Sequence, residues 1–308
     1  MPDGDDISIE EKRVYAGSAG RTDVLLASAD GLVRVAVSGD KVGQFSMVDP
    51  SPARDVAVLP RAAGPDRLAM ATDEDLFVAA FDGDDPQLEP TGIGSTAAVG
   101  LVGPAGPDAF LAATDAGGIV VVPPEASDGP GVETVGTVPD PRAVDSGLVA
   151  AGDGVYRLTS RGSQAVEAGG MDGGSTLRLE HVGLSDVRDV AGAGVPLAGT
   201  ADGLYWLANG WRDALDRPID VLAADGEGHA LAAGSDGLSV HRGREWDGDS
   251  WDESDLPVGG NATALGYGPG IALAATDGGA LCVDADDGWR HQVVGVRDVS
   301  GIAVRSVE

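Results

Sequence analysis

Apolar residues recur along the chain in short runs separated by small turn residues. A representative stretch is LAGTADGLYWL at residues 197–207, in which two apolar runs flank an Ala-Asp-Gly turn. This pattern is typical of a β-hairpin, because Asp-Gly dipeptides favour tight turns between strands. No stretch sustains the 3.6-residue period of an amphipathic helix over three turns. The pattern therefore predicts an all-β chain.

Six further stretches repeat this hairpin pattern. They lie at residues 25–35, 68–78, 111–122, 148–158, 231–240 and 273–283. The turn aspartates of the seven copies are Asp30, Asp73, Asp115, Asp153, Asp202, Asp236 and Asp277, spaced 34 to 49 residues apart. That spacing is close to the roughly 40–45 residues of one four-stranded propeller blade. We therefore expect a seven-bladed β-propeller of four-stranded antiparallel blades; six or eight blades would require one spurious or one missed copy.

A second apolar element precedes six of the hairpins. Its copies lie at residues 53–59, 96–102, 141–147, 187–194, 218–225 and 261–268, and a seventh at 296–304 has no hairpin after it. The first hairpin has no clear copy before it, so the C-terminal segment is expected to supply the inner strand of the first blade. Such pairing of the two ends closes the ring and removes exposed sheet edges.

The whole chain, residues 1–308, is treated as a single propeller domain. Residues 1–20 form either an N-terminal extension or a competing closing strand, because EEKRVYAG at residues 10–17 also suits the inner position.

Charge is the most unusual global feature. Fifty acidic residues face twenty lysines and arginines, for a formal net charge of −30, and lysine occurs only at Lys12 and Lys41. Nucleic-acid binding is disfavoured, because no basic patch is available to displace counterions from phosphates. Such composition is typical of salt-accumulating archaea, since the Debye length falls to about 3 Å at molar salt and screens self-repulsion. The acidity therefore indicates a salt-rich habitat before it indicates any function.

No run approaches the roughly 20 apolar residues of a membrane helix. The start, MPDGDDISIEEKRVYAG, has no apolar core and does not match a secretory signal. We expect a cytoplasmic protein without membrane association.

The repeated ADGLYWL pattern followed by Trp211 resembles the repeats of regulator-type propellers, within the WD-repeat-like superfamily. Asp-box motifs are only echoed, in DADDGWRH at residues 284–291. Together with the lysine-poor acidity, the pattern is most similar to an uncharacterised haloarchaeal β-propeller family. The resemblance implies the propeller fold and carries over no activity.

Arginines at the start of the second element are the first candidate site. They are Arg54, Arg142, Arg188 and Arg297. If these strands begin on one face, the side chains approach the mouth of the central channel and could bind a carboxylate or phosphate through bidentate bonds. The alternative is that each arginine pairs with an aspartate of a neighbouring blade.

The seven turn aspartates are the second candidate, because they would form a ring on one face that attracts cations or a basic partner. The alternative is that they are only turn residues. Trp251, within the acidic loop DGDSWDESD at residues 247–255, is predicted to be exposed and to contact a partner.

Catalytic motifs are sparse. The four histidines show no HxH or HExxH spacing, and there is no GxSxG motif or phosphate-binding loop. We therefore predict a non-catalytic, monomeric scaffold that binds an unknown protein partner, without a metal or cofactor. The alternative is a hydrolase or small-ligand binder with its site at the channel mouth.

Overall fold

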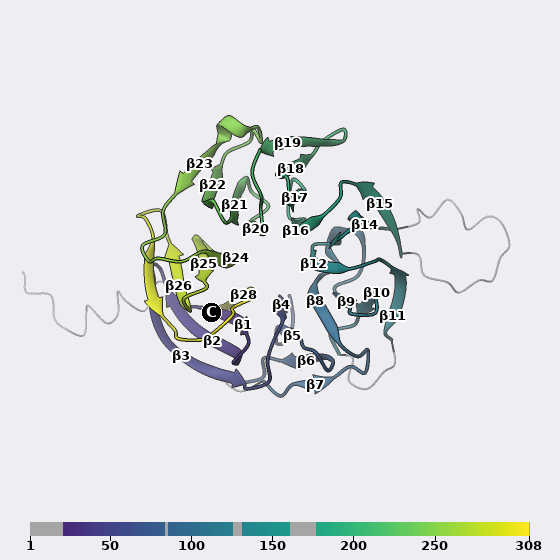
Figure 1. The fold of residues 1–308 in the computed structure, drawn as a ribbon. Helices are drawn as coiled ribbons and strands as arrows, with labels where there is room; N and C mark the ends of the chain where they lie inside the picture. Colours follow the sequence, from purple (N-terminus) through teal and green to yellow (C-terminus); the bar gives the residue numbers. More distant parts are fainter. Residues whose placement is uncertain (1–20, 84–85, 126–130, 161–176, 308) are drawn as a thin grey trace, which may run out of the picture.

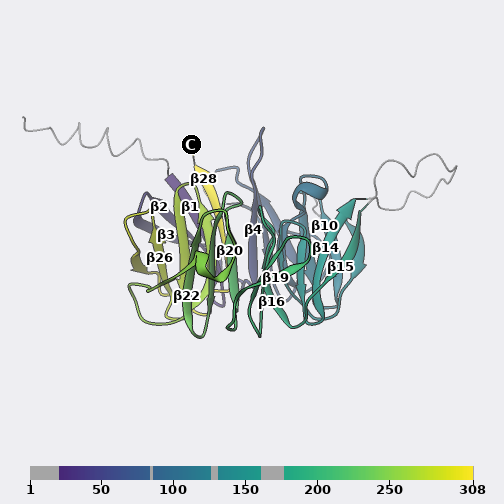
Figure 2. The same ribbon diagram turned by 90° about the horizontal axis from the view of Figure 1, so that it is seen from above.

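Seven four-stranded antiparallel sheets surround a central axis in the computed structural model (Figure 1). The structure describes residues 21–83, 86–125, 131–160 and 177–307. Each sheet radiates outward from its innermost strand, and its strands run from one face of the ring to the other (Figure 2). The predicted seven-bladed β-propeller is confirmed.

We label the blades A to G and give the strands of each from the inside outward. Blade A contains β28 (Gly301–Val307), β1 (Arg21–Ser28), β2 (Gly31–Ser38) and β3 (Lys41–Asp49). Blade B contains β4 (Asp55–Leu59), β5 (Arg67–Ala71), β6 (Leu76–Ala80) and β7 (Glu89–Pro90). Blade C contains β8 (Thr96–Leu101), β9 (Phe110–Thr114), β10 (Gly118–Val122) and β11 (Glu133–Thr137).

Blade D contains β12 (Pro141–Asp145), β13 (Leu148–Ala151), β14 (Gly154–Ser160) and β15 (Leu177–Gly183). Blade E contains β16 (Val187–Ala191), β17 (Leu197–Thr200), β18 (Leu204–Leu207) and β19 (Trp211–Leu215). Blade F contains β20 (Val221–Ala224), β21 (His229–Gly234), β22 (Gly237–Arg242) and β23 (Trp251–Ser254). Blade G contains β24 (Ala262–Gly268), β25 (Ile271–Thr276), β26 (Ala280–Asp284) and β27 (Arg290–Val293). Two short 3₁₀ turns, η1 (Gly103–Ala105) and η3 (Gly248–Ser250), complete the described elements.

The two ends of the chain close the ring in blade A. The C-terminal strand β28 occupies the inner position and pairs antiparallel with β1, from Arg21 opposite Val307 to Ala27 opposite Gly301. This is the closure expected from the unpaired seventh copy of the second element. The competing segment at residues 10–17 lies outside the described residues.

The hairpins between second and third strands are held by hydroxyl groups as well as by glycine. Ser28 Oγ donates to the carbonyl of Gly31, and Thr72 and Thr200 make the equivalent bonds to Asp75 and Gly203. Glycines supply the left-handed backbone, as at Gly31 with φ of 125°, whereas none of the seven turn aspartates has positive φ. These turns therefore differ from the two-residue turns that need positive φ at both central positions.

The core lies between blades rather than at a single centre. Val24, Leu26 and Val35 of blade A pack on Leu273 and Leu281 of blade G, and the other blade pairs repeat this arrangement. Close approach of the inner strands requires glycine at particular sites: a Cβ on Gly100 would lie 2.4 Å from the carbonyl oxygen of Val144 in the next blade. Small residues on inner strands thus set the blade spacing.

The apolar pattern also predicts outer strands at residues 42–48, 161–168 and 290–296. The first and the last overlap β3 and β27, and the remaining one differs. The segment at 161–168 suits the fourth strand of blade D by pattern, but it lies outside the described residues, and the structure places β15 at that position.

Candidate functional site

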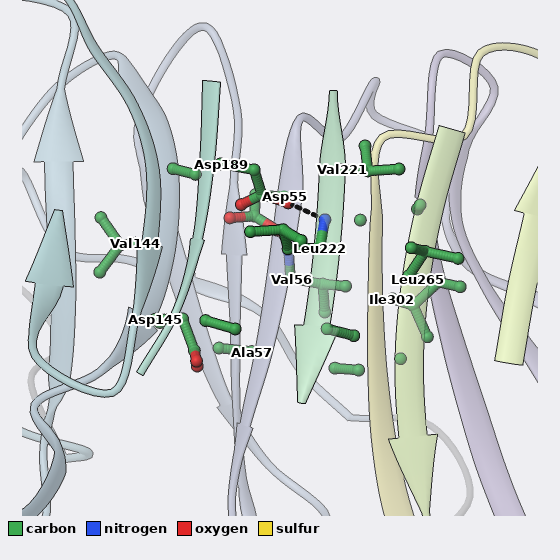
Figure 3. Close-up of a pocket in the computed structure, with 18 of the residues that line it drawn as sticks. Asp55, Val56, Ala57, Val144, Asp145, Asp189, Val221, Leu222, Leu265 and Ile302 are labelled. Carbon is green, nitrogen blue, oxygen red and sulfur yellow. Dashed lines mark hydrogen bonds between the residues drawn. The ribbon is translucent and has the colours of Figure 1, made fainter. Parts of the chain in front are cut away.

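A cavity of about 440 Å³ follows the axis of the ring. Inner strands of all seven blades line it, and most of the side chains that they contribute are alanine, valine or leucine. Four aspartates and three arginines interrupt this apolar lining. Figure 3 shows the side chains of Asp55 and Asp189 directed into the space between the inner strands. We call this space the central cavity.

Asp55, Asp145 and Asp189 join neighbouring blades through backbone hydrogen bonds. Asp55 on β4 accepts the N–H of Val99 on β8 at 2.9 Å, and Asp189 on β16 accepts the N–H of Leu222 on β20 at 2.6 Å, the dashed line in Figure 3. Asp145, at the end of β12, accepts the N–H of Gly192 at 2.6 Å. Each of these carboxylates therefore accepts a hydrogen bond from a backbone N–H of the next blade. No strand of that next blade could reach this donor.

Removal from water dominates the titration of these groups. Burial raises the pKa of Asp55 to about 7 and that of Asp189 to about 8, against the opposing effect of the backbone hydrogen bonds. Burial also raises the pKa of Asp145. The charge of Asp145 adds to the increase at both other sites. The central cavity thus holds interacting carboxyl groups, of which Asp55 and Asp189 titrate near neutral pH.

Three of the four predicted arginines lie beside the central cavity. Arg54 Nη1 contacts Asp115 Oδ2 of blade C at 2.8 Å, and Arg188 pairs with Asp220, just before β20 of blade F. Arg142 bridges Asp140 and Asp186 at 2.8 and 2.7 Å. The bond to Asp186 is the main cause of the raised pKa of Arg142. All three arginines line the cavity and each contacts a carboxylate of the next blade.

Arg297 is placed differently. Although VRDV at residues 296–299 matches the sequence at β16, it lies in the loop before β28, and Asp298 has φ of 51°. The Arg297 side chain is 77% exposed, is not among the residues lining the cavity, and pairs with Asp30 of its own blade. Its backbone N–H also donates to Asp30 Oδ2 at 2.8 Å. The prediction that Arg297 lies at the channel mouth is therefore wrong. Its contacts with Asp30 hold the C-terminal segment to the first hairpin.

The seven turn aspartates occupy the seven predicted hairpins. Each lies between the second and third strands of its blade, on the face that also carries the connections between blades. Asp30 and Asp115 are engaged by arginines, and Asp153 accepts the hydroxyl of Tyr156 at 2.8 Å. The Arg54 and Ser95 bonds hold the pKa of Asp115 below its usual value, with Ser95 the larger contribution. Binding of a partner by this face stays a prediction.

Trp251 is buried, at 8% exposure, so its predicted role as an exposed contact is wrong. It begins β23 and pairs with His241, whose ring centroid is 5.1 Å away. Trp246 stacks on the same His241 ring at 3.9 Å. The η3 turn leaves Asp247 and Asp249 in solvent and returns Trp251 to the blade interior.

The outer strand of blade A carries a surface that the sequence patterns did not single out. Phe45 and Met47 on β3 are 49% and 48% exposed, and Val293 on the adjacent blade G is 53% exposed. The stretch VGQFSMV at residues 42–48 predicts this outer strand, but it does not predict that Phe45 and Met47 are half exposed. These three are the large hydrophobic side chains exposed in the described part of the chain.

Neither a metal cluster nor a membrane helix is found where the structure describes the chain. Across residues 21–307, apart from the gaps named above, no group of three His, Cys, Asp or Glu side chains is arranged to hold a metal ion. Over the same ranges no helix is long and apolar enough to span a bilayer.

A family model described as HVO_0234-like beta propeller matches residues 8–305. The chain therefore belongs to this β-propeller family, as the sequence resemblance indicated. A search of curated proteins found no match.

Several solved structures share the fold at low sequence identity. AztD from Citrobacter koseri has a TM-score of 0.61 at 9% identity, over 94% of this chain and 99% of that one. YCF48 bound to a D1 peptide gives 0.57 at 12%, over 93% and 97%. BBS1N in complex with ARL6DN gives 0.57 at 15%, over 87% and 88%. At these identities the likeness shows the fold alone.

Proposed function

We propose that this protein is a non-catalytic propeller that binds a protein partner in a salt-adapted cytoplasm. The observation that carries the proposal is the contrast between the side chains around the central cavity and those on the outer strands. Charged side chains around the central cavity are engaged in contacts between blades, whereas exposed apolar side chains gather on the outer strands of blades A and G. Exposed apolar patches on soluble proteins mark interaction sites.

Two of the structurally similar propellers were solved with a peptide or protein partner, YCF48 with a D1 peptide and BBS1N with ARL6DN. Propellers of this general shape therefore have faces and rims suited to such binding. This supports the class of function and not the identity of a partner.

The test is capture at molar KCl followed by reconstitution. A tagged chain retained on resin in a lysate of its native host should recover one stoichiometric partner, which is then purified and titrated against the chain by calorimetry. A one-to-one saturable complex supports the proposal. Failure to recover such a partner across growth conditions, or a recovered protein that does not rebind when pure, would contradict it.

A second candidate function is binding or hydrolysis of a small anion in the central cavity. It is favoured by the position of Arg54, Arg142 and Arg188 on one cavity together with carboxyl groups of raised pKa. Against it, each of these arginines already contacts a carboxylate. Citrate and phosphate at millimolar concentration should raise the melting temperature if the second candidate holds, and Arg188→Ala should abolish that rise.

A further inference from the structure

We propose that two neighbouring cavities on either side of blade F form one docking site for a partner segment that carries an arginine two residues from a phenylalanine. This inference rests on the protein-binding function proposed above. It adds a site away from the outer strands and states the chemistry of the partner that this site fits.

The two cavities flank the loop between β20 and β21, residues 225–228. One, of about 240 Å³, lies between blades E and F, and the other, of about 200 Å³, lies between blades F and G. Both are built around the loops that join inner to second strands and third to outer strands, so they lie on the face opposite the seven turn aspartates. We call them the apolar cavity and the acidic cavity.

The apolar cavity is built around Trp246. Small side chains and four glycines complete most of its lining, with the side chains contributed by Ala193, Val195 and Ala224. The Trp246 ring is only 7% exposed and stacks on His241 with the ring centroids 3.9 Å apart. The His241 ring nitrogens lie 2.9 and 2.6 Å from the carbonyl oxygens of Gly228 and Glu245. The indole wall of the cavity is therefore held in place by the protein itself.

Charge does not favour either sign in the apolar cavity. Its charged lining residues are Glu227 and Arg244, one of each sign. A cationic group of a ligand therefore gains more in the acidic cavity, while an uncharged side chain fits beside Trp246.

The acidic cavity has more carboxylates than cations. Two of its four carboxylates already have a partner, at 2.5 Å for Asp225 with His229 and at 3.4 Å for Asp284 with Arg242. Within the described residues, no hydrogen bond or ion pair engages the side chains of the other two, Glu227 and Asp286. These two negative charges can therefore pair with a cation that a ligand brings.

Aromatic rings distinguish this cavity from the rest of an acidic surface. At a net charge of −30, carboxylates alone do not single out a site. Here Tyr267 and Trp289 line the same cavity as the two carboxylates without partners. Trp289 Nε1 donates to Ser254 Oγ of blade F at 3.0 Å, which fixes the ring across the blade boundary. A guanidinium group stacks on aromatic rings and pairs with carboxylates, so arginine matches this lining better than lysine does.

The position of Glu227 sets the spacing of the two ligand groups. It lines both cavities, so a ligand that occupies both must carry its uncharged and cationic groups close together. In an extended segment, side chains two residues apart point to the same side and lie about 7 Å apart. Phenylalanine suits the apolar cavity, because aromatic rings pack favourably on one another.

The test uses the full chain in 1 M KCl and a fluorescein-labelled heptapeptide, Gly-Arg-Gly-Phe-Gly-Arg-Gly, in fluorescence anisotropy. The two arginines serve both directions of the peptide. At this salt, attraction to the rest of the acidic chain is screened beyond about 3 Å. Saturable binding is expected, with at least tenfold weaker binding when alanine replaces the phenylalanine or glutamate replaces both arginines. Equal binding of all three peptides, or no saturation up to about 1 mM, would overturn the proposal.

Variants locate the site. Glu227→Lys should weaken binding of the arginine peptide at least tenfold, because it reverses the charge that both cavities share. Glu253→Lys makes the same change at an exposed position of β23 that lines neither cavity, and should leave the affinity unchanged. Glu227 is also exposed, so neither change disturbs the core. Equal binding by the wild-type and Glu227→Lys chains would place the peptide elsewhere and overturn the proposal.

Other occupants of the site give distinct results. A dimer in sedimentation experiments that Glu227→Lys converts to monomer would make a second copy the occupant and overturn the proposal. Lys12 and Arg13 lie outside the described residues. Peptide binding that appears only when both are changed to glutamate would make the N-terminal segment the occupant, with the same consequence. Equal binding by that double variant and the wild-type chain supports an external partner.

Capture from the lysate separates this proposal from the proposed function. A lysate partner that Glu227→Lys still binds with wild-type affinity would overturn the docking site and leave the protein-binding function intact. Peptide binding at the site without any recoverable lysate partner would contradict the proposed function alone. Loss of the partner with Glu227→Lys and its retention with Glu253→Lys would support both.

Discussion

Arg54 and Asp55 illustrate how two adjacent residues join neighbouring blades in different ways. The guanidinium reaches Asp115 at the surface of the ring, while the next carboxylate accepts the backbone N–H of Val99 inside it. Arg188 and Asp189 repeat this arrangement between blades E and F. The Arg-Asp dipeptide therefore contacts the next blade twice. The arginine side chain makes the solvent-exposed contact, and the aspartate carboxylate makes the contact that faces the central cavity.

The exposed half contributes little to stability. Arg54 and Asp115 are 40% and 46% exposed, and ion pairs of this kind contribute about 0.2–1 kcal/mol. Arg54→Ala should therefore lower the free energy of unfolding by less than about 1 kcal/mol, as measured by urea denaturation in 2 M KCl. The control Arg244→Ala, at an exposed arginine, should change it less. A loss of several kcal/mol would show that the contact has a larger role than its exposure implies.

The inner half makes stability depend on pH. The pKa of Asp189 is raised in the folded chain to about 8, above about 3.9 in an unfolded chain, so the folded state binds the proton more tightly. The resulting stabilisation is fully present below about pH 4 and is lost as pH rises through about 8. Asp189→Asn should therefore flatten the fall in melting temperature between pH 6 and 9.

Asp202→Asn, at an exposed turn, is the control for this pH experiment and should keep the wild-type slope. A wild-type melting temperature that rises steadily over the same range would contradict the assignment.

At the scale of elements, inner strands approach so closely that a methyl group matters. A Cβ on Gly100 of β8 would lie 2.4 Å from the Val144 carbonyl oxygen of β12. Gly100→Ala should therefore destabilise the fold by about 1–3 kcal/mol, because it forces two packed strands apart. Gly259→Ala is the matched control, since no atom lies within 4 Å of its Cβ position. Equal unfolding midpoints for the two variants would show that the strands adjust without cost.

The hairpins could be predicted from sequence because their determinants are local. An aspartate, usually a serine or threonine, and usually a glycine lie within a few residues of one another, and the seven turns follow the predicted spacing. The placement of Arg297 could not be predicted in this way. Its local sequence matches β16, but its partner Asp30 is 267 residues away, and that contact belongs to ring closure. Trp251 is similar, because its contact with the His241 ring is set by strand register.

For the whole molecule, net charge is the dominant variable. A formal charge of −30 over 308 residues generates self-repulsion that salt must screen. The melting temperature should fall as KCl is reduced below about 0.5 M, with the steepest loss in the millimolar range. Scanning calorimetry from 3 M to 10 mM KCl measures it, with sucrose in place of salt as the control. A constant melting temperature across the series would refute salt adaptation.

The sequence by itself determined the repeat, the all-β class, the number of blades, the closure by the C-terminal strand and the charge. These follow from local turn chemistry, from alternation along each strand and from counting. The tertiary structure alone decided which arginine meets which aspartate, that the carboxyl groups of Asp55, Asp145 and Asp189 share the central cavity, and that Phe45 and Met47 on β3 are half exposed. Each of these depends on contacts between residues far apart in the chain, and a repeat of about forty residues does not encode them.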